Sequence, residues 1–419
     1  MRSNTPTRRA RWWAIASLIL AVASLPQAAR ADVVSDWNVT TQSVLLATGG
    51  SPGVYYAMVH AAIYDAVNAI DGRHQVFAVR PKTHHEGASK EAAAAAAAYR
   101  LLLTLCPSQQ ALLDPAYASS LAAVPDSEAK TRGIAVGTEV AAAWLANRAG
   151  DGREAAVPYG FQSGPGQYQR TPPAFRDPLG PWTAKLRPFT MIRPSQFRAE
   201  GPPDLTSERY ADDLRVTQSL GDINSTTRTA IQTEIGRFHT ENPTTFWARN
   251  VRDFAATQHL GIAANARLFA MVFIAFGDAS IACWDSKLYY NRWRPVTAIQ
   301  QADTDGNPAT EVDATWLPLA PTPPDPEYPA AHGCVAGAIL ESLNEFFHTK
   351  HLNLTLTSTV PGSIPHLFTD TDEIIDEVLV ARVYGGTNFP TSVAHGFKIG
   401  KKLGRWIAAT QFRSTECDR

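Results

Sequence analysis

The sequence predicts an all-α fold, and three observations lead to that prediction. Apolar residues recur at helical spacing through most of the chain, alanine-rich segments are frequent, and the apolar–polar alternation that marks a half-buried strand is scarce. Alanine has the highest helix propensity and allows helices to pack closely. The chain has 419 residues, of which 45 % are hydrophobic and 18 % charged, so it can bury a large core. We therefore expect a soluble globular protein made of packed helical bundles.

The first 31 residues have the composition of a secretory signal peptide. An apolar run at 12–25 follows a basic start, and Ala29-Arg30-Ala31 offers a cleavage site of the small-x-small type. The basic start contains Arg2, Arg8, Arg9 and Arg11, which leaves both ordinary secretion and twin-arginine export open. The apolar run is too short for a transmembrane helix, and no later stretch reaches about 18 uninterrupted apolar residues. We expect the mature protein to be secreted or periplasmic, with no membrane span after signal removal.

Charge and cysteine spacing argue against two classes of ligand. Residues 1–31 hold five arginines and no acid, so the remainder has 33 basic residues against 39 acidic ones, a formal charge of −6. A net negative charge argues against nucleic acid as a partner. The cysteines have no C-x-x-C spacing, which argues against a structural zinc site; they are Cys106, Cys283, Cys334 and Cys417. Export permits disulfides, and Cys283 and Cys334 both lie near the motifs described below, so they could approach one another.

The N-terminal half is expected to form a first helical bundle, which together with the connection that follows it spans 32–206. Helical periodicity predicts three helices in it, at 54–70, 91–105 and 126–148. Asp71-Gly72 ends the first of these, Pro107 follows the second, and Gly150 follows the third. Residues 151–206 are rich in glycine and proline and have no sustained period, so we predict a long connection there.

The C-terminal half, 207–419, is expected to form a second bundle. Its periodic segments predict helices at 207–220, 225–237, 264–293, 335–347 and 374–384. Ser225 and Thr226 are the candidate caps of the second helix, and Pro295 breaks the third.

Lys287 and Arg294 are the first sign of a functional site in this half. They are seven residues apart, which on one helix places them two turns apart and about 20° from the same azimuth, so both can face one ligand. A guanidinium offers a rigid fork to oxyanion oxygens, and an ammonium acts as a point charge. The alternative is a solvated or acid-paired helix face. The position of both residues directly before Pro295, in a segment rich in aromatic residues, favours a binding site.

His332 and Arg382 extend this cationic set. His332 precedes a helix-like run at 333–340, and a loop that enters a helix directs free backbone N–H groups toward any anion at that point. Arg382 precedes Gly385-Gly386, a flexible turn that can bring the chain around an oxyanion. Together the four residues predict a pocket for a tetrahedral oxyanion.

The segments around these residues resemble a known signature. Residues 287–295, 329–332 and 382–388 are similar to the motifs K-x6-R-P, P-S-G-H and S-R-x3-G-x-H of vanadium-dependent haloperoxidases and type-2 phosphatidic acid phosphatases. Exported bacterial haloperoxidase-like proteins also have segments similar to 60–69 and 266–270, and the resemblance covers roughly residues 35–415. It implies an all-α fold of two packed four-helix bundles, with the pocket in the C-terminal bundle.

The resemblance also implies a role for each pocket residue. The oxyanion, vanadate or phosphate, would be bound by Lys287, Arg294 and Arg382, with backbone amides of Ala331 and Gly386 as further donors. His332 would transfer protons as the catalytic residue. Asn388 stands at the position of the histidine that binds vanadium or attacks phosphorus in the family. An amide is a weak metal donor and no nucleophile, so the site is predicted to be degenerate.

Three functions follow from this set of residues. The first is a secreted haloperoxidase-type oxidoreductase, in which bound vanadate activates hydrogen peroxide to oxidise a halide, which then reacts with an organic acceptor. The second is an acid phosphatase-like hydrolase acting on a phosphate ester. The third is a catalytically silent protein that keeps an oxyanion-binding pocket for phosphate, sulfate or a phosphorylated ligand.

Overall fold

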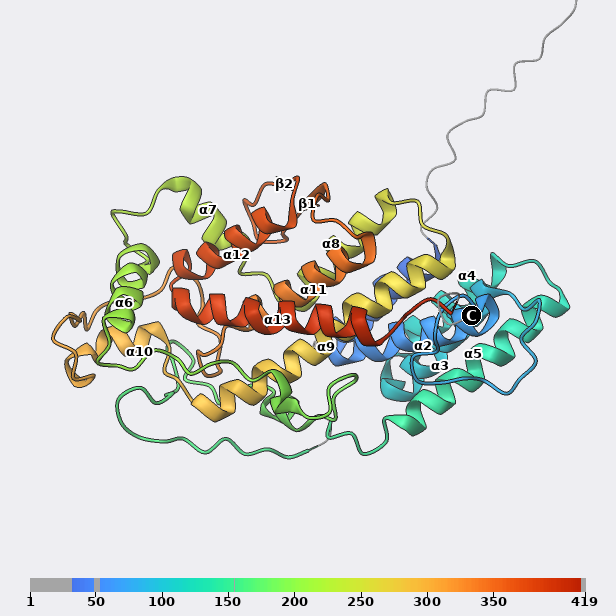
Figure 1. Cartoon of the computed structure of the whole chain (residues 1–419), viewed down its shortest axis with the longest axis horizontal. Helices are drawn as coiled ribbons and strands as arrows, with labels where there is room; N and C mark the ends of the chain where they lie inside the picture. Colours follow the sequence, from blue (N-terminus) through green and yellow to red (C-terminus); the bar gives the residue numbers. More distant parts are fainter. Residues whose placement is uncertain (1–31, 49–52, 154, 416–419) are drawn as a thin grey trace, which may run out of the picture. The chain divides into compact units, whose positions relative to one another are not determined.

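The structure is a computed structural model and describes residues 32–48, 53–153 and 155–415. The predicted signal peptide at 1–31 and Cys417 lie outside the described residues. Over the described part the chain is mostly helical, with one short β-hairpin, so the all-α prediction is confirmed (Figure 1).

The N-terminal part contains α1 (Val33–Ala47), α2 (Gly53–Asp71), α3 (Lys90–Leu105), α4 (Gln110–Ala122) and α5 (Glu128–Asn147). The C-terminal part contains α6 (Glu208–Gly221), α7 (Ala230–Phe238), α8 (Pro243–Thr257), α9 (Ile262–Tyr290), α10 (Pro295–Gln300), α11 (Ala331–Phe347), α12 (Thr371–Tyr384) and α13 (Pro390–Thr410). Strands β1 (Leu354–Leu356) and β2 (His366–Phe368) pair antiparallel, with Leu354 opposite Phe368.

Helix α9 is shared by two groups of helices. It packs against α2 and α3 in one group, which also includes α5, and against α11 and α13 in the other, which also includes α12 (Figure 1). By length and composition α9 could cross a membrane, but 89 % of its most apolar window is buried inside the protein. Its apolar surface is therefore covered by neighbouring helices, which is the behaviour of a core helix.

Two predicted boundaries are wrong, for identifiable local reasons. Helix α9 ends at Tyr290 because Asn291 adopts a left-handed conformation, φ 47°, so Lys287 and Arg294 are not on one helix. Arg294 instead precedes α10 in an extended conformation. Helix α7 begins after Thr229, which forms a reciprocal capping box with Gln232, and not at the predicted caps near 225.

In the described residues of the long connection predicted at 151–206, which are 151–153 and 155–206, there is no α-helix and there are two short 3-10 turns, Pro181–Lys185 and Pro194–Phe197. A buried carboxylate on α9 holds it in place. Asp278 accepts hydrogen bonds from the backbone N–H of Phe189 at 2.7 Å and of Thr190 at 2.8 Å. The connection therefore lies across α9 in a defined position.

Helices α11 and α13 make backbone contact through glycine. A Cβ atom added at Gly400 would lie 2.2 Å from the carbonyl oxygen of Cys334, and one at Gly333 would lie 2.5 Å from that of Val393. Neither approach is compatible with a side chain. This contact fixes the first turn of α11, which carries His332, against the first turn of α13, which follows Asn388.

Cys283 and Cys334 do approach one another, as their positions near the motifs suggested. Burial and the neighbouring thiol of Cys283 raise the pKa of Cys334 well above its ordinary value, and the Cys283 thiol donates to the carbonyl of Pro329 at 3.6 Å. Both thiols are free in the described part of the chain. A buried thiol with a raised pKa is scarcely ionised and therefore unreactive.

A second buried carboxylate organises the N-terminal helices. Asp65 on α2 accepts hydrogen bonds from the backbone N–H groups of Phe77, Ala78 and Val79 at 2.9, 3.2 and 3.0 Å, and from the indole of Trp144 at 3.0 Å. Burial raises its pKa to about 6, although these four donors act in the opposite direction. Asp65 thus joins α2, the loop after it and α5.

We expect Asp65→Ala to lower the free energy of unfolding by about 3 kcal/mol at pH 7.5, because it leaves buried donors without an acceptor. Urea unfolding followed by circular dichroism measures the change. Asp126→Ala is the control: its side chain is 97 % exposed, and we expect a change within about 0.5 kcal/mol. Equal effects for the two variants would contradict the role given to Asp65.

Candidate oxyanion site

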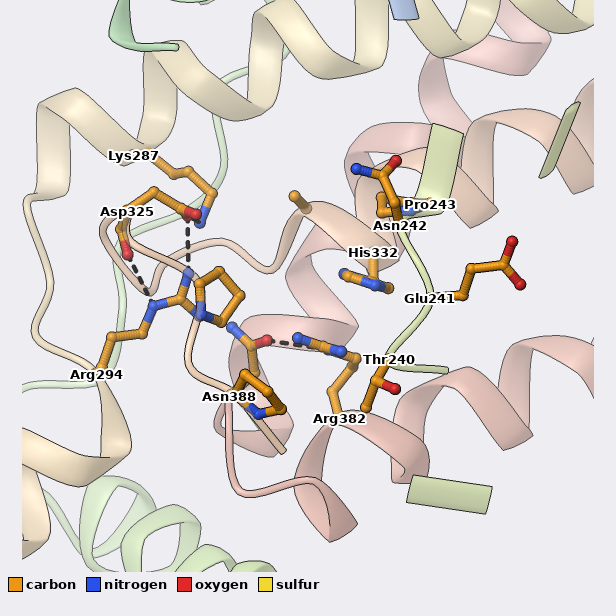
Figure 2. Close-up of a pocket in the computed structure, with 13 residues that line it drawn as sticks. Thr240, Glu241, Asn242, Pro243, Lys287, Arg294, Asp325, His332, Arg382 and Asn388 are labelled. Carbon is orange, nitrogen blue, oxygen red and sulfur yellow. Dashed lines mark hydrogen bonds and ion pairs between the residues drawn. The ribbon is translucent and has the colours of Figure 1, made fainter. Parts of the chain in front are cut away.

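A cavity of about 280 Å³ opens where the end of α9, the segment before α11, the first turn of α11 and the end of α12 meet (Figure 2). Its lining residues are Thr240, Glu241, Asn242, Pro243, Lys287, Arg294, Pro321, Pro323, Asp325, Ala331, His332, Arg382 and Asn388. The cavity is small compared with pockets that enclose drug-sized ligands, and a hydrated tetrahedral oxyanion fits within it.

All but one of the predicted site residues meet at this cavity. Lys287, Arg294 and Arg382 are 1, 2 and 3 % exposed, so three buried cations line one small space. Ala331, His332 and Asn388 line it as well. Lys287 and Arg294 reach it from two separate elements, so their convergence does not depend on the shared helix that the sequence suggested.

The structure does not bring Gly386 to the cavity within the described residues. Its N–H donates to the carbonyl of Val383 at 2.9 Å, and its backbone packs against Gly221 and Pro318. Gly386 has φ 69°, where a side chain would be strained, so it serves the turn after α12. Its amide is therefore not available to an oxyanion in this arrangement, which corrects the expectation from the motif.

Asp325 lies between Lys287 and Arg294 on the cavity wall (Figure 2). Its Oδ1 atom is 2.9 Å from Nζ of Lys287 and 2.8 Å from Nη2 of Arg294. Burial alone would raise the pKa of Asp325, but the two cations lower it below its ordinary value. The carboxylate is thus ionised at neutral pH and neutralises part of the positive charge in the cavity.

Backbone carbonyl groups accept hydrogen bonds from further N–H groups of the same two cations. Lys287 donates to the carbonyl oxygens of Pro326 and Glu327, the latter at 3.2 Å. Arg294 donates through Nε to the carbonyl of Asp325 at 2.8 Å and through Nη1 to that of Thr387 at 2.9 Å. The segment before α11 therefore binds both cations as an internal ligand.

Asn388 is held on both sides by charged partners. Its Oδ1 accepts from Nε of Arg382 at 3.3 Å (Figure 2). Its Nδ2 donates to Oε1 of Glu327 at 2.9 Å. Glu327 is 1 % exposed and also accepts from the N–H of Phe389 at 3.1 Å. Ser392, one turn along, donates to the carbonyl of Glu327 at 3.4 Å. The amide of Asn388 thus bridges a cation and a carboxylate.

His332 lies on the first turn of α11 and is neutral at physiological pH. Burial lowers its pKa well below 6.5, and the positive charge of Arg382 lowers it further. Its buried Nε2 atom has no hydrogen-bond partner among the described residues. Ala330, which precedes the helix, supplies no capping side chain, so the N–H groups of this turn favour an anion in the cavity.

A hydrogen-bonded series of histidine and glutamate side chains holds the loop whose carbonyl group binds Arg382. The carbonyl of His239 accepts from Nη1 of Arg382 at 3.2 Å, and its ring nitrogen Nε2 is 2.8 Å from Oε1 of Glu377. The same Glu377 oxygen is 2.8 Å from Nδ1 of His366, whose Nε2 is 2.9 Å from Oε2 of Glu234. This network fixes the loop that presents its carbonyl to the Arg382 guanidinium.

Sequence reasoning missed Asp325, Glu327 and His239. A signal for the first two exists: they are acids two residues apart in a proline-rich loop, five and seven residues before His332. Residues two apart in an extended segment point to the same side, so such a pair can serve two neighbouring groups on that side. His239 gave no comparable signal, because it lies 93 residues before His332 in the chain and meets the site only through the fold.

Comparisons with known proteins agree with this arrangement. Residues 267–415 match the family model described as the VCPO second helical-bundle domain, VCPO standing for vanadium chloroperoxidase. The vanadium chloroperoxidase of Curvularia inaequalis is 29 % identical over 210 residues, which is 42 % of this chain and 34 % of that protein. The chain thus matches about a third of the length of this curated relative.

Solved structures match over nearly the whole chain. A bacterial vanadium-dependent iodoperoxidase superimposes with a TM-score of 0.78 at 24 % identity, covering 91 % of this chain and 96 % of its own. A holo-type bacterial vanadium-dependent chloroperoxidase gives 0.65 at 17 % identity, covering 92 and 93 %. At these identities the likeness establishes the fold, which is that of bacterial vanadium haloperoxidases.

Proposed function

Because residues 267–415 carry the vanadium chloroperoxidase second helical-bundle domain, we propose that this chain is a degenerate, exported haloperoxidase-like protein. Its pocket binds a small tetrahedral oxyanion through charge and hydrogen bonds alone. The observation that carries the proposal is a pair of features in the pocket wall: an amide at Asn388, and the carboxylate of Asp325 between two of the three cations.

The residues present do not fit vanadate as a coordinated cofactor. An amide side chain is a poor metal donor, and both polar atoms of the Asn388 side chain are engaged, by Arg382 and by Glu327. A highly charged oxyanion also requires uncompensated cations, whereas Lys287 and Arg294 share Asp325. The pocket therefore lacks both a nitrogen donor at position 388 and the full positive charge that such a group would need.

The other groups of the pocket are suited to non-covalent binding of an anion. Arg382 faces the cavity with a guanidinium whose pKa is lowered by burial and by the neighbouring Arg294, so an anion relieves the repulsion between two like charges. The first turn of α11 adds uncapped N–H groups. Neutral His332 contributes a ring nitrogen that can donate or accept without adding charge.

Haloperoxidase activity is the second candidate, and His332 favours it. A neutral imidazole beside buried cations is suited to proton transfer with hydrogen peroxide. The substrates in that case would be hydrogen peroxide, a halide and an organic acceptor. The phosphatase alternative would need a nucleophile in place of Asn388, and His395 contacts the hydroxyl of Tyr328 instead of lining the cavity.

Phosphate calorimetry tests the proposed function. We expect the wild-type protein to bind inorganic phosphate and Arg382→Ala to bind it at least 30-fold more weakly, since a charge-assisted hydrogen bond contributes about 2 kcal/mol. Arg382→Lys keeps the charge without the fork, and we expect an intermediate affinity. Arg198→Ala is the matched control, because Arg198 pairs with Asp285 and does not line the cavity. Absence of phosphate binding, or an Arg382→Ala affinity equal to wild type, would remove the proposal.

A further inference from the structure

A second, larger hollow adjoins the oxyanion cavity. It has a volume of about 540 Å³ and shares Asn242, Pro243, Asp325 and Ala331 with the smaller one. The two spaces are therefore neighbours separated by the same wall residues.

The larger hollow has an aromatic and apolar lining. Trp182 comes from the long connection, Phe276 and Trp284 come from α9, and Val335 comes from α11. The two tryptophans are partly exposed, whereas Phe276 and Val335 are each 3 % exposed. Its chemistry thus differs from that of the neighbouring cavity, where charged side chains dominate.

The indoles are set by a glycine turn. Gly180 has φ 83°, and a Cβ atom there would lie 3.8 Å from Cζ2 of Trp284 and 4.0 Å from Nε1 of Trp182. The preceding residue, Leu179, donates its N–H to the carbonyl of Pro324 at 3.2 Å, next to Asp325. The turn that lies next to both rings is therefore bonded to the segment that lines the oxyanion cavity.

The charge of the pocket limits the ligand. Lys287, Arg294 and Arg382 contribute three positive charges, Asp325 and Glu327 contribute two negative ones, and His332 is neutral. Glu241 also lines the cavity, but its charge is balanced by Arg249, which lies 2.7 Å away. One net positive charge remains. A head group with a single negative charge matches it, and a dianion or trianion exceeds it.

We propose that the two hollows form one binding site for an aromatic monoanion with a tetrahedral head group, such as an aryl sulfonate or aryl sulfate ester. The head group lies at Arg382 and the first turn of α11, and the ring lies against Trp182 and Trp284. Burial of the ring on aromatic walls adds affinity that the head group alone lacks. This inference rests on the proposed function, because it requires the oxyanion cavity to bind an anion.

Calorimetry with three probes tests the inference: 2-naphthalenesulfonate, methanesulfonate and 2-naphthalenemethanol. We expect 2-naphthalenesulfonate to bind at least tenfold more tightly than either of the others, because only it fills both hollows. Trp284→Ala and Trp182→Ala should each weaken 2-naphthalenesulfonate at least fivefold and leave methanesulfonate and phosphate within twofold. Arg382→Ala should weaken both sulfonates. Trp406→Ala, at a tryptophan that does not line either hollow, is the control.

The outcomes separate this inference from the proposed function. If methanesulfonate and phosphate bind but the naphthalene ring adds less than twofold, the inference is wrong and the oxyanion function stands. If no anion binds, both are wrong. If Arg382→Ala and Trp284→Ala both bind 2-naphthalenesulfonate as tightly as the wild-type protein does, its binding site is elsewhere on the surface. That result also overturns the inference.

Discussion

Replacing Asp325 with asparagine is expected to raise the affinity for inorganic phosphate by about 100-fold. The carboxylate is 2.9 Å from Lys287 and 2.8 Å from Arg294, so in the wild-type protein an incoming anion competes with it for both cations. Asparagine removes the charge and keeps the size. About 2.7 kcal/mol corresponds to 100-fold, which is the scale of one or two charge-assisted hydrogen bonds made available to the ligand. Calorimetry at pH 7 measures the change.

The matched control for this prediction is Asp285→Asn. Asp285 lies two residues before Lys287 on α9, but its partner is Arg198 and it does not line the cavity. We expect its phosphate affinity to equal that of the wild type. Because the lowered pKa keeps Asp325 ionised from neutral pH down to below its ordinary value of 3.8, mild acidification should not reproduce the effect. An Asp325→Asn affinity within threefold of wild type would contradict the internal-ligand role.

Asn388→His combined with Asp325→Asn is expected to produce peroxide-dependent bromination at least 100-fold above the wild-type level. The first change supplies an imidazole at the position where the resemblance places one, and the second makes two buried cations available. Each single variant is expected to remain near the wild-type level, since either missing element alone leaves the pocket without what a coordinated oxyanion needs. Bromination of monochlorodimedone in the presence of orthovanadate, peroxide and bromide measures the activity.

The comparison of the single and double variants shows whether both positions limit the activity. Equal activity in Asn388→His and in the double variant would show that Asp325 does not block the site. Activity in neither, with both proteins folded by circular dichroism and binding phosphate, would place the limiting feature elsewhere, for example at Ala330, which supplies no side-chain hydroxyl to the pocket. Introducing His332→Ala into the double variant should abolish any gained activity, because it removes the proton-transferring imidazole.

Helical periodicity predicted the central elements because their apolar faces pack against other helices. Helices α2, α3, α5, α6, α11 and α12 lie close to their predicted positions. Helices α1, α4, α8, α10 and α13 were missed. Helix α4 contains Pro115, and α13 begins at Pro390 and contains three glycines that admit α11, so composition argued against helix at both. Tertiary packing overrides that local preference.

The sequence indicated several residues that line the cavity. It did not indicate which elements carry them or which side chains pair with one another. Lys287, Arg294, His332, Arg382 and Asn388 do meet at one cavity. The reasoning that placed the first two on one helix was wrong, because a single left-handed residue, Asn291, redirects the chain. Asp325 was not anticipated, since whether an acid in a proline-rich loop pairs with a cation depends on three-dimensional contact. That contact determines the charge of the pocket and therefore its ligand.

The central claim is that this pocket binds an oxyanion through charge and hydrogen bonds, without a bond from the protein to the central atom of the ion. The most direct test is the ratio of the dissociation constants for phosphate and orthovanadate, measured on the wild-type protein in the same buffer. Both ions are tetrahedral, so a pocket that uses only charge and hydrogen bonds should bind them within about fivefold of each other. An orthovanadate affinity 100-fold or more above that for phosphate would require a bond to the metal and would contradict the claim.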